Sequence, residues 1–388
     1  MSLRSLLQIC VLHGDKDERQ EMLNDVKTYD VILTTYGTLK NDEDKYEKLK
    51  FDYCILDEGQ NIKNPLAQST KSVKNIKAEN KFILTGTPIE NNLIELWSIF
   101  DFIMPGYLNN VHNFKNRFIN KENTAIELQK YIKPFMLRRL KKDVIRELPE
   151  KIEKNYYVEL TKEQKKVYAS YVRDIKEKME NDEFRDDKIT IFSYLTKLRQ
   201  LCLDPSVVLD DYNGKSGKIE EAVSIIENNV LDNHKILLFS QFTSVLKNIS
   251  KRLCEKNIKH FYLDGSTNAG KRMELVEQFN NNDETKVFLI SLKAGGTGLN
   301  LTSADIVIHF DPWWNPAVED QATDRAHRIG QENVVQVFKL ISEGTVEDKI
   351  LSLQEKKKQL IKDVLDSDYK HDNILGSLSK EELIELFE

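Results

Sequence analysis

Cysteine is scarce in this chain of 388 residues, and the four that occur, Cys10, Cys54, Cys202 and Cys254, stand far apart. No C-x-x-C pair is present, so the sequence supports neither a zinc site nor a disulfide framework, and a reducing cytosol is the simplest setting. No apolar run approaches about 18 residues, so we expect no membrane-spanning helix. The start, MSLRSLLQICVLHG, lacks the small-residue cleavage site of a signal peptide.

A strong excess of one charge is also lacking. The chain has 57 Lys and Arg against 63 Asp and Glu, which gives a net charge of −6. This balance neither requires nor excludes nucleic acid, because binding depends on a local basic stripe rather than on the total charge. Hydrophobic residues make up 40% of the chain, which is enough for a large core, and the length suits two or three domains.

A phosphate-binding loop of the form G-x-x-x-x-G-K-[ST] is missing as well. Gly-Lys pairs begin at positions 214, 217 and 270. The first has Leu209 where the motif needs its upstream glycine, and the others are followed by Ile219 and Arg272. These 388 residues therefore offer no loop of this kind to surround a triphosphate with backbone amides and a lysine.

Two regions alternate short apolar runs with helical stretches, as sheets built from βαβ units do. The first region contains the candidate strands QICVLHG, DVILTTY, DYCILDE and KFILTGTP. The second contains KILLFS, HFYLDG, KVFLIS, ADIVIHFD and VVQVFKLIS. Both regions therefore predict an α/β fold.

Helices are predicted between and after these regions. Over 106–215 the strand pattern stops, and TKEQKKVYASYVRDIKEKMENDEF has apolar residues at helical spacing. Residues 212–222 are typical of a linker into the second sheet. Beyond about 346 a long charged helix is predicted, and the last twenty residues indicate a short helix or a tail.

Two adjacent acids, Asp57 and Glu58, end the apolar run in FDYCILDEGQNIKNP, residues 51–65. A parallel strand can present such a pair at the sheet edge where α/β folds bind ligands. NTPases use acids of this kind to hold Mg²⁺ and to orient a water against a phosphate. Taken alone, the pair is a weak signal and is more typical of residues that cap the next helix.

Two later segments add to this pattern. LTGTP, 84–88, follows one strand and precedes a helix. SLKAGGTGLNLTSADIVIHFDPWWNPAVEDQATDRAHRIGQ, 291–331, has glycines that allow close backbone approach. Its end predicts a helix with Gln321, Arg325 and Arg328 on one face, where two guanidinium groups suit phosphate oxygens. The alternative is a surface ion pair between Asp324 and Arg328.

In order and spacing, these motifs resemble the SNF2 family of superfamily 2 helicase-like ATPases, which are DNA translocases of remodelling and repair. The matching segments also include TTYGTL, MLRRLKKDVIRELPEK, LLFSQFTSVL and YLDGSTNAGKRMELVEQFN, and the resemblance covers about 30–350. It implies two RecA-like lobes, the first incomplete, with a helical insertion between them and a C-terminal helical extension. The implied domains are 1–105, 106–215, 216–350 and 351–388.

The resemblance also implies roles for individual residues. Catalysis would use Asp57, which also binds the metal Mg²⁺, with Glu58, Arg325 and Arg328. ATP contacts would involve Gln321, Gly296 and Gly298, and coupling between nucleotide and DNA would involve Thr85, Gly86 and Thr87. Contacts to the DNA backbone, without base readout, would come from Thr34, Thr35, Tyr36, Gly265, Ser266, Thr297 and Asn300.

Several other residues have two readings. The basic residues Arg138, Arg139, Lys141 and Lys142 either add to the DNA track or form a solvated helix face. We interpret Trp313 and Trp314 as packing residues rather than base-stacking ones, and His309 as a core residue on an apolar strand. His327 is assigned no role.

Two departures from the family pattern qualify these expectations. Gly59 stands where the family usually has Ala, and the segment expected before VLHG, with its P-loop, does not occur in these residues. We therefore interpret the chain as an N-terminally truncated, bacterial, cytoplasmic and nucleoid-associated motor, itself inactive as an ATPase. It would act on double-stranded DNA with ATP and Mg²⁺, alongside protein partners of a remodelling or transcription complex. The alternatives are a non-catalytic DNA- or protein-binding module, and an RNA helicase or restriction-type motor.

Overall fold

The computed structural model describes residues 7–86, 93–119, 121, 124–139, 141–145, 147–180, 188–295 and 298–365. The described residues divide into two compact units, with unit 1 running to Phe135 and unit 2 from Met136 to Gln359. Among the described residues, none of the helices is both long and apolar enough to cross a membrane.

Unit 1 contains the four strands predicted for the first region. Its strands and helices are β1 Ile9–Val11, α1 Lys16–Asn24, β2 Val31–Leu33, α2 Tyr36–Asn41, α3 Glu43–Tyr46, β3 Lys50–Leu56, α4 Gln68–Lys74, β4 Lys77–Ile83, α5 Leu93–Ile103, α6 Val111–Phe114 and α7 Ala125–Ile132. Short tight turns of helix occur at Val26–Thr28, Gly59–Ile62 and Lys133–Phe135, and a π-helical turn at Lys115–Ile119.

The strands of unit 1 form two parallel pairs, β1 with β2 and β3 with β4. One face of these strands packs on a core that includes Leu12, Leu39, Leu56 and Phe102. Because side chains alternate along a strand, the other face is also apolar, and there the large side chains Ile9, Val11, Leu33, Tyr53, Ile55 and Phe82 are each at least half exposed. Parallel sheets usually have both faces covered, so this surface is unusual.

Unit 2 is built on one six-stranded parallel sheet in the order β5-β10-β9-β6-β8-β7. Its strands are β5 Lys151–Val158, β6 Ile236–Ser240, β7 His260–Leu263, β8 Val287–Ser291, β9 Ile306–His309 and β10 Val335–Ser342. The helices are α8 Lys141–Val144, α9 Lys162–Glu180, α10 Lys188–Leu203, α11 Gly217–Leu231, α12 Thr243–Glu255, α13 Ala269–Asn281, α14 Leu292–Gly295, α15 Pro316–Thr323 and α16 Val346–Leu365. A short 3₁₀ turn spans Pro205–Val207.

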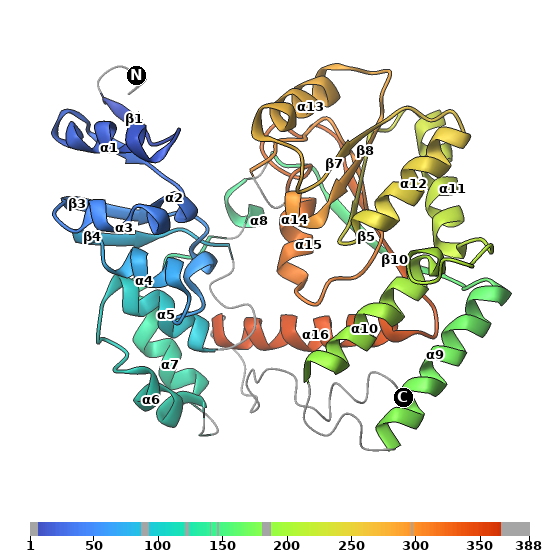
Figure 1. Ribbon diagram of the computed structural model, residues 1–388, viewed down its shortest axis with the longest axis horizontal. Coiled ribbons are helices and arrows are strands. Elements are labelled where there is room, and N and C mark those ends of the chain that lie inside the picture. The colour runs from blue at the N-terminus through green and yellow to red at the C-terminus, as the bar shows by residue number, and fades with distance from the viewer. Residues whose placement is uncertain are drawn as a thin grey trace. The chain divides into compact units, whose positions relative to one another are not determined.

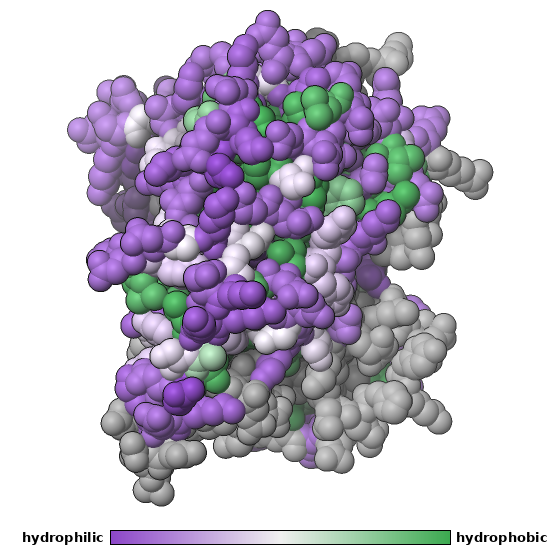
Figure 2. Space-filling view, turned by 90° about the vertical axis from the view of Figure 1, so that its right-hand side faces the viewer, coloured by the Kyte–Doolittle hydropathy of each residue, from purple (hydrophilic) through white to green (hydrophobic). Residues whose placement is uncertain are grey.

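Helices cover both faces of this sheet. Helices α11 and α12 pack on one face, and α13, α14 and α15 on the other (Figure 1). Strands β6, β8 and β9 are buried along their whole length, as their unbroken apolar runs predict. The α/β class with parallel sheets is therefore confirmed. On the face of the molecule in Figure 2, hydrophilic residues predominate and hydrophobic ones form small separate groups.

Strand β5 corrects the prediction that 106–215 is a helical insertion. It pairs with β10 along eight residues at the edge of the second sheet, and unit 2 begins well before residue 216. Its sequence, KIEKNYYV, is largely polar and exposed, so it has no apolar run to reveal it. The predicted helices on either side of it are present as α7, α9 and α10, and the charged helix after 346 is present as α16.

Candidate functional site

Asp57 and Glu58 follow directly after β3, in a turn that we call the acid turn, residues 57–60. Strand β3 is held in register with β4 as far as the pair Leu56 and Ile83. The amide of Leu84 then donates to the carbonyl of Leu56 at 2.8 Å, and the amide of Gly59 donates to the carbonyl of Leu84 at 2.9 Å. The acids therefore lie at the carboxyl ends of two paired parallel strands, where α/β folds bind ligands.

The backbone of Glu58 is in the left-handed region, with φ 50° and ψ 55°. Side chains other than glycine seldom adopt this conformation, which costs about 1 kcal/mol or more. The turn holds it in place: the Asp57 carboxylate accepts from the Glu58 amide at 2.9 Å, and Asn61 donates to the Glu58 carbonyl at 2.9 Å. The helix-cap reading fails for both acids, because the Glu58 side chain makes no cap hydrogen bond at Gly59–Ile62 and the Asp57 carboxylate bonds the adjacent amide.

Gln60 joins the acid turn to the end of β4. Its side-chain amide donates to the Glu58 carboxylate at 2.7 Å, and its carbonyl oxygen accepts from the Thr85 hydroxyl at 2.8 Å. Glu58 and Thr85, both predicted site residues, are thus connected through one side chain. Gln60 was not among the predicted site residues, although its place three positions after Asp57 in the D-E-x-Q pattern could have indicated it.

The segment after β2 reaches the acid turn from the other side. The phenol of Tyr36 donates to the carbonyl of Asp57 at 2.7 Å. Burial, with Asp57 nearby, raises the pKa of Tyr36 to about 12. Thr35 caps α2 by accepting from the amide of Thr38, whereas Thr34 is exposed. Three predicted groups, Tyr36, the acids and Thr85, therefore meet in unit 1.

In unit 2 the predicted helix carrying both arginines ends early. Helix α15 stops at Thr323, so Gln321 is helical whereas Arg325 and Arg328 lie in the turns that follow. The carbonyl of Arg325 accepts from the amide of Leu301 at 3.0 Å, which replaces a helical bond by a tertiary one. The expectation that all three share one helix face is wrong: Arg325 is buried and Arg328 is exposed.

Lys141 fixes this arginine segment in place. Its ammonium lies 2.5 Å from the Asp324 carboxylate and donates to the carbonyl of His327 at 3.1 Å. His327 in turn contacts the carbonyl of Pro149 at 2.8 Å through its ring nitrogen. Asp324 thus pairs with Lys141, and not with Arg328 as in the alternative reading of this segment. Arg138 and Arg139 are exposed, and the side chain of Lys142 lies outside the described residues.

The remaining predicted DNA contacts occupy loops after neighbouring strands β7 and β8. Gly265 and Ser266 follow β7, and both the amide and the hydroxyl of Ser266 donate to the Asp264 carboxylate, at 2.9 and 2.6 Å. Asn300 follows β8 and is exposed, as is Gly298, a predicted nucleotide contact with φ 48°. Gly86 is described after β4, whereas Thr87, Gly296 and Thr297 lie outside the described residues.

The tryptophans and His309 pack as predicted. Trp313 and Trp314 lie against the hydrophobic cores of unit 2, with the Arg199 guanidinium 5.9 and 5.3 Å from their ring centres. Arg199 also donates to the carbonyl of Pro312 at 2.5 Å. His309 is buried, contacts the Thr323 hydroxyl at 2.8 Å, and has its pKa lowered to about 4 by that burial.

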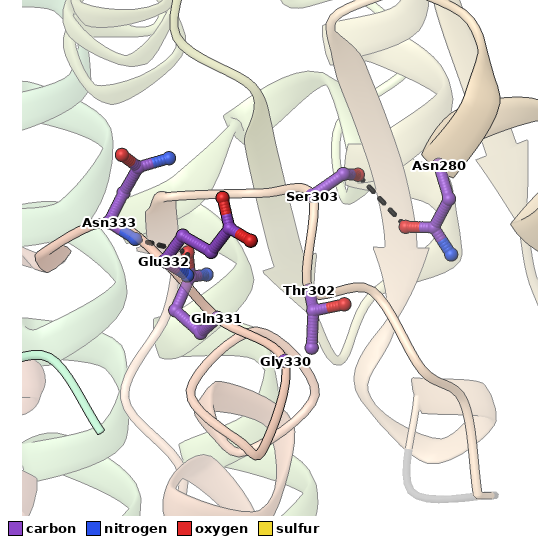
Figure 3. Close-up of a pocket in the computed structure, with 7 residues that line it drawn as sticks. All are labelled: Asn280, Thr302, Ser303, Gly330, Gln331, Glu332 and Asn333. Atoms are coloured by element: carbon purple, nitrogen blue, oxygen red, sulfur yellow. Dashed lines mark hydrogen bonds between the residues drawn. The ribbon is translucent and has the colours of Figure 1, made fainter. Parts of the chain in front are cut away.

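A polar hollow of about 330 Å³ lies at the opposite edge of the sheet, near the amino ends of β9 and β10. Figure 3 shows it lined by residues from the end of α13 and from two loops: Asn280, Thr302, Ser303, Gly330, Gln331, Glu332 and Asn333. The Ser303 hydroxyl donates to Asn280 at 2.9 Å, and the Gln331 carbonyl oxygen accepts from two backbone amides. None of the described residues that line it is a predicted site residue, and the side-chain amides of Asn280 and Gln331 donate to backbone carbonyls nearby.

Comparison with known proteins gives two family matches that together cover most of the chain. A model of the SNF2-related domain matches residues 3–207, and a model of the helicase conserved C-terminal domain matches residues 217–330. The first of these alone spans more than half of the 388 residues.

Individual relatives are longer than this chain. An uncharacterized ATP-dependent helicase of Mycoplasma genitalium is 40% identical over 389 residues, which is 98% of this chain but 37% of that protein. The TATA-binding protein-associated factor MOT1 of Saccharomyces cerevisiae is 34% identical over 98% of this chain and 24% of its own length. The Sulfolobus solfataricus SWI2/SNF2 ATPase core in complex with dsDNA is 38% identical, with a TM-score of 0.48, over 93% of this chain and 77% of that one.

Proposed function

This chain belongs to the SNF2 family of helicase-like ATPases, and we propose that it is part of a motor that uses ATP hydrolysis to translocate along double-stranded DNA. The observation that carries the proposal is the hydrogen-bonded series Thr85–Gln60–Glu58 beside Asp57. It joins the acid turn to the segment after β4 at the carboxyl ends of paired strands. Such a connection suits an enzyme in which a change at the phosphate must be passed to another segment.

The acid turn has the chemistry that a magnesium nucleotide requires. Mg²⁺ is usually held by one or two carboxylates together with phosphate oxygens and water. The exposed Asp57 carboxylate would supply the protein ligand, and Glu58 would accept a proton from, or orient, the attacking water. The bound Mg²⁺ would neutralise charge on the transferred phosphoryl group.

We assign Arg325 and Arg328 to stabilising charge on the γ-phosphate, and Gln321, Gly296 and Gly298 to contacts with the nucleotide. Phosphoryl transfer depends mostly on positioning and charge, and an arginine of this kind is worth roughly 10³–10⁵ in rate. Arg325 is buried, and its carbonyl accepts a hydrogen bond from the amide of Leu301. Arg328 is exposed. Their unequal burial suggests that Arg328 is the more mobile of the two.

The DNA track would consist of Thr34, Thr35, Gly265, Ser266, Thr297 and Asn300, with Gly86 and Thr87 joining Thr85 in coupling. Backbone amides and hydroxyls grip phosphates without reading bases, as a translocase requires. Protein partners, of the sort indicated by the name of the yeast relative, and a nucleoid location are further parts of the proposal.

The isolated 388-residue chain should hydrolyse ATP poorly, because it contains no G-x-x-x-x-G-K-[ST] loop. The test joins the chain to a preceding segment that supplies such a loop and measures ATP hydrolysis with duplex DNA, with RNA and with neither. We expect duplex DNA to stimulate hydrolysis. Glu58→Gln should then reduce the rate by about 10²–10⁴-fold, as loss of a positioned base does.

The matched control is Glu79→Gln, which removes an exposed carboxylate on β4 of the same unit and should leave the rate unchanged. Stimulation by RNA instead of DNA would indicate an RNA helicase. Rapid hydrolysis by the isolated chain would disprove the expected inactivity, and no hydrolysis by the extended one would favour a binding module.

A further inference from the structure

Tyr36 makes a direct hydrogen bond between two segments to which different tasks have been assigned. Its phenol donates to the carbonyl oxygen of Asp57 at 2.7 Å. Tyr36 is the first residue of α2, directly after Thr34 and Thr35, and Asp57 is the first residue of the acid turn. A shift of residues 34–36 is therefore transmitted to the acid turn through one bond.

The surroundings of this bond make it able to transmit movement. The backbone at Tyr36 is tied to α2, because Thr35 caps that helix through the amide of Thr38 at 3.1 Å. The acid turn is held at its far side by Gln60 and Thr85. The Asp57 carbonyl therefore lies in a series of hydrogen bonds that runs from α2 to Thr85.

The phenol already donates its proton to the Asp57 carbonyl, whereas a phosphate ligand would need a free donor. The ring is partly buried, and its hydroxyl bonds to the protein backbone. The earlier reading of Tyr36 as a DNA contact is thus less suited to the geometry than a role behind Thr34 and Thr35, which are exposed.

We propose that Tyr36 is a positioning residue that transmits the engagement of duplex DNA at Thr34 and Thr35 to the acid turn. This inference rests on the proposed function, because it requires the chain to bind DNA through this segment. In this role Tyr36 connects DNA binding to the position of the proposed catalytic acids. It is a second connection to the acid turn, in addition to the Thr85–Gln60–Glu58 series.

The test measures amide hydrogen exchange of the 388-residue chain with and without a short duplex DNA. We expect the DNA to slow exchange in residues 57–62 by about fivefold, the factor that corresponds to one hydrogen bond of coupling. Tyr36→Phe removes only the hydroxyl and should abolish this slowing while DNA affinity is retained. The control, Tyr53→Phe, alters an exposed ring on β3 that stacks on Phe82 and should behave as the wild type.

The outcomes separate this inference from the proposed function. If the wild-type chain does not bind duplex DNA, both fail. If it binds without slowing exchange in 57–62, or if Tyr36→Phe keeps the slowing, only the role of Tyr36 fails. If Tyr36 were merely structural, Tyr36→Phe would speed amide exchange in the absence of DNA but leave the slowing by DNA intact. That result also overturns the inference.

Discussion

Gly59 offers the sharpest test of how the acid turn is packed. A Cβ added there would lie 2.2 Å from Cγ2 of Ile83 and 3.6 Å from the carbonyl oxygen of Leu84. Carbon atoms normally stay about 3.5–4.0 Å apart, so Ala at this position forces the neighbours to move by more than about 1 Å. The φ of Gly59 is not positive, so the backbone itself would accept Ala, and the cost is purely one of space.

The magnitude follows from two opposing effects. Overpacking of this kind costs about 1–3 kcal/mol, and Gly→Ala recovers about 0.4–1 kcal/mol by restricting the unfolded chain. We therefore expect Gly59→Ala to lower the free energy of unfolding of unit 1 by about 1–2 kcal/mol. In an Ile83→Ala background the clashing methyl is gone, so the same change should cost nothing or should stabilise slightly.

The assay is a double-mutant cycle of Gly59→Ala and Ile83→Ala. Unfolding in urea is monitored by hydrogen exchange in peptides from β3 and β4, so that the stability of unit 1 is measured separately. The bond from the Gly59 amide to Leu84 should weaken first, because the clash pushes these two strand ends apart. The reasoning is refuted if Gly59→Ala is as stable as the wild type, or if its cost persists unchanged when Ile83 is Ala.

Three further predictions concern unit 2. Burial raises the pKa of Asp311 to about 6 and lowers that of His309 to about 4. The contribution of Asp311 to the free energy of unfolding therefore falls as the pH rises from about 4 to 6, whereas the contribution of His309 increases. In His309→Gln only the Asp311 contribution remains, so the free energy of unfolding should fall as the pH rises over this range. Urea titration at several pH values measures this change. Lys218→Met should destabilise unit 2 by about 3–5 kcal/mol, because it strands the fully buried partner Glu347, 2.5 Å away, and adding Glu347→Leu should restore much of this in thermal unfolding. In the extended chain, Arg328→Ala should slow ATP hydrolysis by roughly 10³-fold or more with little loss of stability, and an unchanged rate would remove Arg328 from the site.

The sequence was sufficient to predict the strands that carry continuous apolar runs. The predicted runs before Asp57 and around His309 became β3 and β9. Burial on both faces of the parallel sheet explains the apolar run of β9, whereas β3 is apolar although one of its faces is exposed. The placement of the acids at a strand end followed from the same signal. The packing of His309 and of the two tryptophans was also predictable, since each lies within or next to such a run.

The failures have a common cause, which is tertiary contact. Strand β5 is polar and exists through its pairing with β10. Helix α15 was predicted to continue through Arg328, but the bonds from Leu301 to Arg325 and from Lys141 to Asp324 replace the helical pattern. Gln60 and the phenol of Tyr36 were not predicted in their present roles, because their partners lie 21 to 25 residues away in sequence.

Glu58 has a consequence for anyone who engineers this protein. Its left-handed backbone is a position where Gly or Asn is less strained. A library sorted for thermal tolerance alone should therefore enrich Gly or Asn at position 58 and discard the carboxylate. The most resistant clones would be those without the proposed catalytic group, so a screen on this chain must score ligand response alongside heat resistance.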